Sequence, residues 1–507
     1  MNYTPKKWLC MMRFRLILAI VSLLAVTSCG CTQKADKTVP PSNGDFVRMT
    51  NDIQVPTELL TIPVPISVLL PKSYLSEPER RYPVVYMLHG LGDNPQSWND
   101  SWLRVQSTIE SLEDAGLGDM IYVFPSGYKT YYCNRIGGGY PYMDMFINEL
   151  IPFVDNAYRT IPDREHRAVT GYSMGGFGAC ALALKHPEMF IASAPLSMSF
   201  RTDQQYMTEE QSGWDGQWGK IFGGRGETGQ ARLTDYYKEH CPFYQFTAAN
   251  KEKVSGVHWY FTCGDNEEQL LIAGDALHVQ MRDAGIEHEY RVGDGGHEGS
   301  YWRAALKEVL PMFDHDMNGA TIWKDQAEKI DIQPLSFDKT FVSKHYSAGD
   351  GCLVLLAHSG LDKTTLGKIM AAMDKSDYNK AFVLYPCDLS QKTLNVWAEE
   401  AKAAYPASKL ICVTVGADGS PALQMAGEFE RTIFIDSSFS VNPSLTKGQK
   451  VFFACAEDAA NYAGMNALYN SCKAAEATFE YRVLQSSGDT VDNWARSIKS
   501  IISTFLY

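Results

Sequence analysis

The sequence has no surplus of positive charge. Asp and Glu number 59 against 46 Lys and Arg, and the formal net charge is −13. The basic residues also form no stripe interleaved with aromatic side chains, and contacts to a phosphate backbone need clustered Lys and Arg. We therefore do not expect nucleic acid as a partner.

Spacings typical of metal sites are missing as well. The 12 cysteines include no Cys-x-x-Cys pair, and the 11 histidines include no His-x-x-x-His pair, so we predict no metal site. The irregular cysteine spacing in a chain of 507 residues does not indicate a disulfide framework either, and no pairing can be deduced from it.

The apolar run near the N-terminus is too short to span a bilayer. It covers residues 16–26, about half of the roughly 20 residues that a spanning helix needs. Basic residues precede it and small polar residues follow it, which is the layout of a secretory signal. Residues 26–29 resemble a bacterial lipobox, so we predict a signal peptide over residues 1–28 and lipidation of Cys29. The lipid anchor would hold the protein on a membrane of the bacterial cell envelope, in the periplasm or at the cell surface. An ordinary cleaved signal with an incidental cysteine is the alternative.

The chain is too long for one ordinary hydrophobic core, so two folded units are expected. Residues 29–45 are polar with paired prolines, which indicates a linker. Short apolar runs then alternate with amphipathic stretches, which predicts a mostly parallel sheet with helices on both faces over residues 46–318. The strand-like runs are residues 82–88, 120–124, 168–170, 190–195 and 257–263.

The pattern begins again after about residue 315. YFTCGD (260–265) followed by HEYRV (288–292) is matched by FFACAE (452–457) followed by FEYRV (479–483) at a similar separation. Earlier in each half, VVYMLHGL is matched by VLLAHSGL and YVFP by VLYP. Four echoes in the same order predict an internal duplication, with residues 319–507 as a second, smaller α/β unit. Two α/β layers of similar composition are the alternative.

GYSMG (171–175) matches Gly-x-Ser-x-Gly, the nucleophile elbow of α/β-hydrolases. A strand-like segment precedes it and a helix-forming segment follows it. On such a tight turn the serine oxygen projects into the site, and the following N–H groups point at the developing oxyanion. Glycines flank the serine because side chains there would collide with the neighbouring strand and helix. We predict Ser173 as the nucleophile.

The elbow predicts an acid and then a histidine downstream. His297 lies in a glycine-rich loop, residues 293–299, and is predicted as the general base. Asp265 follows the apolar run 257–263, where its carboxylate would accept the imidazole N–H and fix the tautomer. A helix N-cap is the alternative role for Asp265, and Asp294 is the rival acid. The remaining histidines of this region are assigned to packing or to the surface: His258, His278 and His288.

The loop after the strand-like run 82–88 begins with His89, Gly90 and Leu91. In α/β-hydrolases a loop here supplies one oxyanion N–H, and the residue after the nucleophile supplies the other. We therefore predict the N–H groups of Leu91 and Met174 as the oxyanion hole, and a structural role for His89.

Together these motifs resemble the esterase family that includes esterase D, feruloyl esterases and acetyl xylan esterases. The resemblance covers about residues 50–315 and implies a cofactor-free Ser-His-Asp esterase with an α/β-hydrolase fold, often acting on acyl groups attached to carbohydrate. The matching stretches are YPVVYMLHG (82–90), ELIPFVD (149–155), GYSMGG (171–176) and Gly295-Gly296-His297 followed by Tyr301-Trp302.

Members of this family differ most in the stretch that corresponds to residues 198–246. Here it contains Trp214, Trp218 and Phe222, which are weak candidates for an acyl or sugar platform. A lid packed on its own tryptophans is the alternative.

Laid over the first half, the second half lacks the predicted triad. Ala417 falls at Ser173, Glu457 falls at Asp265 and Gly488 falls at His297. An alanine cannot attack and a glycine cannot move a proton. We therefore predict that residues 319–507 form a degenerate, non-catalytic hydrolase-like domain.

The sequence thus predicts a serine carboxylic-ester hydrolase that acts through an acyl-enzyme. The expected substrate is an acylated carbohydrate, with feruloyl or acetyl groups on polysaccharide. Two alternatives stay open: an acyltransferase with the same triad, and a non-catalytic glycan-binding lipoprotein.

Overall fold

The computed structural model describes residues 47–320, 341–342, 352–360, 382–406 and 408–486. The predicted signal peptide, Cys29 and Gly488 lie outside the described residues. Within the described ranges, no helix combines the length and the apolar character that a membrane span requires.

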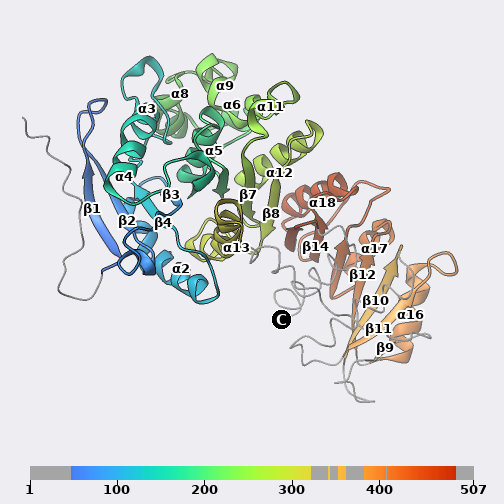
Figure 1. Ribbon diagram of the computed structural model, residues 1–507. Helices are drawn as coiled ribbons and strands as arrows, with labels where there is room; N and C mark the ends of the chain where they lie inside the picture. Colours follow the sequence, from blue (N-terminus) through green and yellow to red (C-terminus); the bar gives the residue numbers. More distant parts are fainter. Residues whose placement is uncertain (1–46, 321–340, 343–351, 361–381, 407, 487–507) are drawn as a thin grey trace, which may run out of the picture.

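One continuous sheet runs through both halves of the chain (Figure 1). Its described strands follow the order β1-β2-β4-β3-β5-β6-β7-β8-β15-β14-β13-β12-β10-β11-β9. The strands of the first half are β1 Met49–Val55, β2 Val64–Leu69, β3 Val84–Leu88, β4 Ile121–Pro125, β5 Arg167–Tyr172, β6 Ala192–Leu196, β7 His258–Gly264 and β8 Glu289–Gly293. The strands of the second half are β9 Phe341–Val342, β10 Leu353–Ser359, β11 Phe382–Cys387, β12 Lys409–Val415, β13 Arg431–Ile435, β14 Lys450–Ala456 and β15 Thr478–Leu484.

The two halves repeat one strand order. It reads β2-β4-β3-β5-β6-β7-β8 in the first half and β9-β11-β10-β12-β13-β14-β15 in the second. In each half the first pair of this series is antiparallel and all the following pairs are parallel. The second half is therefore an α/β unit of the same topology, and the first half has the mostly parallel mixed sheet of the α/β-hydrolase fold.

The halves meet where β8 pairs antiparallel with β15, at Val292 and Val483. Because equivalent edge strands meet antiparallel, an approximate twofold rotation relates the two halves. The sequence predicted two α/β units but not that they share one sheet. We call this junction the seam; it comprises β8, β15 and the residues that bridge them.

Helices cover both faces of the first half of the sheet (Figure 1). Alternate side chains of β3 enter different cores, with Val85 facing α2 and α13 and Tyr86 facing the side of α4, α5 and α12. The helices outside the segment between β6 and β7 include α2 Val105–Asp114, α4 Ile151–Ala157, α5 Met174–Lys185, α12 Glu268–Asp283 and α13 Gly299–Asn318 in the first half, and α16 Leu394–Ala404, α17 Ser420–Gln424 and α18 Tyr462–Ala474 in the second.

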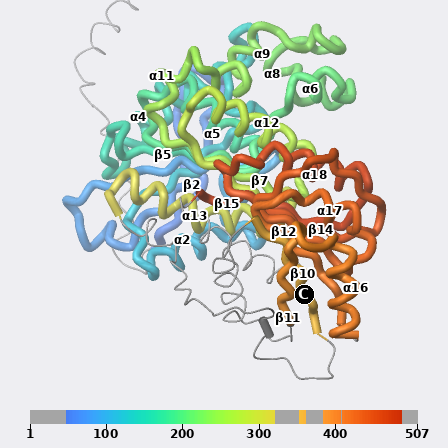
Figure 2. The backbone as a smooth tube through the Cα atoms, turned by 90° about the vertical axis from the view of Figure 1, so that its right-hand side faces the viewer, coloured from blue at the N-terminus to red at the C-terminus, as the bar shows by residue number. Residues whose placement is uncertain are grey.

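A group of short helices lies between β6 and β7 and includes α6 Asp203–Thr208, α8 Gly219–Phe222, α9 Asp235–His240, α10 Pro242–Gln245 and α11 Lys251–Val254. In both views, α18 of the second half lies beside α12 of the first (Figure 2). The carboxyl ends of β5, β7 and β8 meet at one edge of the sheet, which is where parallel α/β sheets place their chemistry.

Candidate active site

Ser173 lies on the turn between β5 and α5. Its φ of 56° and ψ of −117° are strained values for a residue other than glycine. Its N–H donates to the carbonyl of Leu196 at 3.0 Å, which helps to hold the turn. A Cβ on Gly175 would overlap the backbone of Leu88, and a Cβ on Gly171 would overlap the backbone of Gly175. Close packing therefore requires the glycines that flank the serine, as the motif predicted.

His297 reaches Ser173 from the loop after β8. Its Nε2 lies 2.8 Å from Ser173 Oγ, and its Nδ1 lies 2.6 Å from Oε2 of Glu267. Because an ionised carboxylate can only accept, Nδ1 carries the proton and Nε2 accepts from the serine hydroxyl. The histidine side chain is 43% exposed, so this proton-transfer pair is open to a substrate.

The carboxylate that contacts His297 belongs to Glu267, and the prediction of Asp265 for this position is wrong. Glu267 lies three residues after the end of β7, and its side chain is 1% exposed. Its Oε1 accepts from Ser197 Oγ at 2.5 Å and from the N–H of Gly264 at 2.9 Å. The longer glutamate side chain thus turns back under the strand end and reaches the imidazole.

Asp265 points into the seam instead. Its Oδ2 accepts from the guanidinium of Arg482 at 2.9 Å and from the N–H of Tyr481 at 3.1 Å. Its Oδ1 accepts from the N–H of Gly295 at 3.2 Å. Asp294, the rival acid, lies 3.7 Å from the same guanidinium. Both aspartates therefore face Arg482, and the sequence of the first half alone gave no sign of this partner.

Two further side chains, Ser197 and Trp302, hold Glu267 from behind, and the sequence analysis gave neither of them a role in the site. Trp302 Nε1 donates to Ser197 Oγ at 2.8 Å, which directs the serine hydroxyl proton towards Glu267. The Trp302 ring also stands at 90° to the His297 ring, with 5.0 Å between the centroids. The resemblance to the family pointed to Trp302, but no motif pointed to Ser197. In the sequence, the one indication of Glu267 was that it is a second acidic residue close to the end of β7.

The predicted oxyanion donors occupy suitable positions. Met174 is the first residue of α5, so its N–H is one of those that have no partner within the helix. Leu91 follows Gly90 in the loop after β3. The assignment of these two N–H groups to the oxyanion hole stays a prediction.

His89 has a structural role, as expected. It is buried, and its Nδ1 donates to the carbonyl of Gly90 at 2.8 Å while its Nε2 accepts from the N–H of Gly127 at 2.9 Å. Burial lowers the pKa of this imidazole, so it stays neutral. Both ring nitrogens are occupied in holding two loops together.

Trp214, Trp218 and Phe222 are packing residues, so the prediction of a substrate platform is wrong. Each is at most 1% exposed. Trp218 stacks on Phe222 and lies 4.4 Å from Tyr131 between ring centroids, and Trp214 Nε1 donates to the carbonyl of Gly224 at 2.7 Å. The structure shows the alternative, a helical segment packed on its own tryptophans.

An exposed aromatic residue beside the triad was also missed. Trp102, in the loop between β3 and α2, is 42% exposed. Its ring centroid lies 5.2 Å from that of Trp302, which in turn contacts His297. An accessible indole at this position is suited to packing against an apolar or sugar ring. No sequence motif marks Trp102, because its proximity to the triad arises from tertiary packing.

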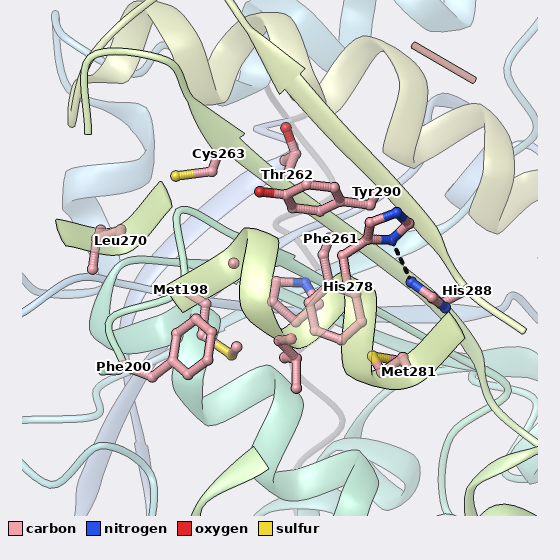
Figure 3. A pocket seen from close by; sticks show the side chains of 13 residues that line it. Met198, Phe200, Phe261, Thr262, Cys263, Leu270, His278, Met281, His288 and Tyr290 are labelled. Carbon is pink, nitrogen blue, oxygen red and sulfur yellow. Dashed lines mark hydrogen bonds between the residues drawn. The ribbon is translucent and has the colours of Figure 1, made fainter. Parts of the chain in front are cut away.

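An apolar pocket lies between α12 and the strands β7 and β8 (Figure 3), and neither Ser173 nor His297 lines it. Within it, His278 Nδ1 lies 2.8 Å from His288 Nε2, and His278 Nε2 donates to the carbonyl of Glu457 at 2.8 Å. Burial lowers the pKa of His278 to about 3. These histidines are packing residues, as predicted, and the pocket is separate from the candidate active site. Its other labelled lining residues are Met198, Phe200, Phe261, Thr262, Cys263, Leu270, Met281 and Tyr290.

The equivalent edge of the second half has no counterpart to the triad among the described residues. The N–H of Gly416 donates to the carbonyl of Ile435 at 2.9 Å, and Gly416 has a φ of 57°, so it occupies the position of Ser173. The prediction that Ala417 stands there is wrong by one residue. Glu457 does correspond to Asp265, since the N–H of each donates to the carbonyl that ends the next strand.

Comparison with known proteins identifies the family. The family model described as "Putative esterase" matches residues 58–313, which is just over half of the chain. The chain belongs to this family. The match covers strands β2 to β8 together with Ser173, Glu267 and His297.

Curated relatives match this same part of the chain. An esterase of Mycobacterium tuberculosis, Esterase Rv1288, is 27% identical over 246 residues, which are 46% of this chain and 52% of that protein. An endo-1,4-beta-xylanase/feruloyl esterase of Xylanibacter ruminicola is 26% identical over 252 residues, which are 48% of this chain and 28% of that protein. The chain therefore spans about half the length, or less, of the curated relatives it matches most extensively.

Among solved structures, a ferulic acid esterase is similar to 53% of this chain over 98% of its own length, with 28% sequence identity and a TM-score of 0.45. The S-formylglutathione hydrolase FrmB of Staphylococcus aureus matches at 20% identity over 53% of this chain and all of its own, with a TM-score of 0.43.

Proposed function

We propose that this member of the esterase family is a serine carboxylic-ester hydrolase that works through an acyl-enzyme. The proposal rests on one observation, the unbroken line of hydrogen bonds from Ser173 Oγ through His297 to the buried carboxylate of Glu267. A serine is a weak nucleophile unless a neighbouring base accepts its proton, and this line supplies the base and fixes its tautomer.

The reaction begins when Ser173 Oγ attacks the ester carbonyl carbon and His297 Nε2 takes the hydroxyl proton. The carboxylate of Glu267 stabilises the resulting imidazolium. The N–H of Met174, at the N-terminus of α5, and the N–H of Leu91 would stabilise the oxyanion. Nε2 then returns the proton to the departing alcohol, which leaves an acyl group on Ser173. Water, activated by the same imidazole, releases the acid and restores the enzyme.

For the substrate we propose feruloyl or acetyl esters on polysaccharide. Trp102 supports this, since an exposed indole beside His297 can pack against an aromatic acyl group or a sugar ring. The names of two relatives, an endo-1,4-beta-xylanase/feruloyl esterase and an acetyl esterase, point to the same class of ester.

We also propose export and lipid anchoring at Cys29, on the layout of residues 1–29 alone. Cells that express the full chain and are fed a radiolabelled fatty acid should label the wild type and not Cys29→Ala. Equal labelling of the two would contradict the proposal.

The test of the enzyme proposal uses the full chain with p-nitrophenyl acetate, methyl ferulate and acetylated xylan. Wild type should release acid, and Ser173→Ala should lose at least about 10⁴-fold in kcat because it removes the hydroxyl that hydrogen-bonds to the base. Ser440→Ala, in the second half, is the control and should keep full activity. Wild-type rates in Ser173→Ala would disprove the assignment of the nucleophile. Transfer of the acyl group to an added sugar in preference to water would instead identify an acyltransferase.

A further inference from the structure

The seam contains the same tetrapeptide twice, EYRV at residues 289–292 and 480–483. The arginine of each copy crosses the seam to the acid that follows the second strand of the other half, counted from the seam. Arg482 donates to Asp265 at 2.9 Å, and Arg291 donates to Glu457 at 2.9 Å. The N–H of the preceding tyrosine donates to the same carboxylate in both copies. The seam is therefore built from two matched ion pairs.

The two acids differ in what lies next to them. Asp265 is two residues before Glu267, and its Oδ1 also accepts from the N–H of Gly295, two residues before His297. The N–H of Asn266 donates back to the carbonyl of Gly295 at 3.0 Å. Asp265 thus joins the segment that carries the triad acid to the loop that carries the base.

Glu457 makes the matching backbone contact, but no triad residue stands beside it in the part of the chain that the structure describes. Its Oε1 accepts from the N–H of Ser486 at 3.3 Å, as Asp265 Oδ1 accepts from the N–H of Gly295. Two residues after Glu457 stands Ala459, the counterpart of Glu267, since the N–H of each donates to the carbonyl of the last residue of the preceding strand. Among the described residues, Arg482 therefore contacts a segment that carries a triad residue, whereas the segment that Arg291 contacts across the seam carries none.

Arg482 also binds the His297 loop directly. Besides Asp265, its guanidinium lies 3.7 Å from Asp294 and 2.6 Å from Glu480. These three carboxylates lie close enough together to resemble a cation site, and the guanidinium supplies the positive charge among them. The side chains of Arg482 and Asp265 are 3% and 1% exposed, so solvent screens their interaction little.

We propose that Arg482, contributed by the second half of the chain, is a positioning residue for the triad of the first half. By holding Asp265 and Asp294, it keeps the segments of Glu267 and His297 in hydrogen-bonding register with Ser173. The role in catalysis rests on the proposed function, while the role in geometry does not. The second half would then complete the acid–base side of the active site although it carries no triad of its own.

The physical reason is the flexibility of the loop that carries the base. Residues 293–297 include three glycines, and Gly295 has a φ of 144°, so the backbone itself restricts this loop weakly. Displacement of a catalytic group by about 1 Å can cost about 100-fold in rate. The contacts of Arg482 with Asp265 and Asp294, which hold this loop, therefore matter more for turnover than for substrate binding.

The test compares Arg482→Gln with Arg291→Gln in the full chain. The two substitutions remove matched buried arginines from one seam, so both should lower the melting temperature. Only Arg482→Gln should lower kcat on p-nitrophenyl acetate and the rate of Ser173 labelling by a fluorophosphonate, each about 10- to 100-fold, with KM within about twofold of wild type. Arg291→Gln should keep both rates within about twofold. Arg482→Lys should recover part of the loss, because its ammonium can still donate to Asp265.

Wild-type labelling and kcat in Arg482→Gln would overturn the inference and leave the proposed function standing, provided Ser173→Ala is inactive. Equal losses in Arg482→Gln and Arg291→Gln would also overturn it, since general loosening of the seam would explain both. If the glutamine variants do not fold, Arg482→Lys and Arg291→Lys take their place, and equal rates in this pair overturn the inference. Labelling of the wild type without ester hydrolysis would remove the proposed function, and the labelling rates would still decide the positioning role.

Discussion

The carboxyl edges of the two halves share a backbone and differ in their side chains. Both have a residue of positive φ at the turn after the central strand, Ser173 in the first half and Gly416 in the second. Each half also has a second residue of positive φ directly after the next strand, Ser197 after β6 and Asp436 after β13. The N–H of Ser197 donates to β7, and the N–H of Asp436 donates to β14. The strained turns that present a nucleophile are therefore retained where no nucleophile stands.

The second half also lacks the triad acid and has a shorter helix after the turn. Glu267 is replaced by Ala459, and the helix after the turn shortens from 12 residues in α5 to 5 in α17. A shorter helix presents a weaker positive terminus to an oxyanion. The strand order and turn geometry are therefore properties of the scaffold. The proposed chemistry depends on a few side chains that, among the described residues, the first half alone carries.

The largest expected effect separates the two acids that follow β7. Glu267→Gln should lower kcat by about 10³- to 10⁴-fold, because it removes the charge that stabilises the imidazolium and disturbs its tautomer. Asp265→Asn should cost at most about 100-fold, since Asp265 acts at one remove through Gly295. Steady-state kinetics on p-nitrophenyl acetate measures both. Glu457→Gln is the control in the second half and should leave kcat unchanged. A larger loss in Asp265→Asn than in Glu267→Gln would return Asp265 to the role of triad acid.

The next effect concerns Asp275, which holds the halves together at the seam. Its Oδ1 accepts from Tyr290 of β8 at 2.8 Å and from Tyr462 of α18 at 2.7 Å, and burial raises the pKa of Asp275 to about 6. The folded state thus binds this proton more tightly than the unfolded state, whose carboxyl titrates near 4. Stability from this group is full below about pH 4, falls as the pH rises to about 6, and stays low above that.

Asp275→Asn should therefore be more stable than wild type at pH 7 by about 2 to 3 kcal/mol, and nearly equal to it at pH 4. Chemical denaturation of both proteins at several pH values measures the difference. Asp283→Asn, at the exposed end of α12, is the control and should show no such pH-dependent gain. A constant difference across the range would mean that Asp275 does not titrate between pH 4 and 6.

A smaller effect is expected from the hydroxyl behind the triad acid. Ser197→Ala removes one of the two donors to Glu267 Oε1 and leaves Trp302 Nε1 without its acceptor. The loss of one hydrogen bond to a charged group is worth about 1.5 kcal/mol, so kcat should fall by about tenfold with little change in KM. Asp436→Ala, at the equivalent position of the second half, should leave kcat unaltered. An equal fall in both variants would point to a general loss of stability.

The smallest effect is expected at Gly416, which occupies the position of the nucleophile in the second half. Gly416→Ser places a hydroxyl at the position of the nucleophile, but Ala459 provides no acid there. In a Ser173→Ala background this substitution should restore no hydrolysis and should cost about 1 to 2 kcal/mol of stability, because a φ of 57° is strained for serine. Fluorophosphonate labelling and thermal unfolding measure the two outcomes. Recovered activity would show that the second half retains a working acid and base.

Much of the fold could be predicted because its signals are local. Alternating apolar runs and amphipathic helices specify a parallel α/β layer, and the echoed motifs specified that it occurs twice. The elbow around Ser173 and the glycine-rich loop of His297 were also readable, since each depends on a short stretch of sequence. The structure places these two side chains 2.8 Å apart, although 124 positions separate them.

The identity of the triad acid was decided by the tertiary structure alone. Asp265 and Glu267 follow the same strand two residues apart, and the local sequence led to the prediction of Asp265. Arg482, 217 residues further along the chain, comes to lie 2.9 Å from Asp265 and fixes that carboxylate in the seam. Glu267, with one more methylene group, is left to reach His297. A contact between residues 217 positions apart depends on how the two halves pack, so no pattern within the first half could have specified it.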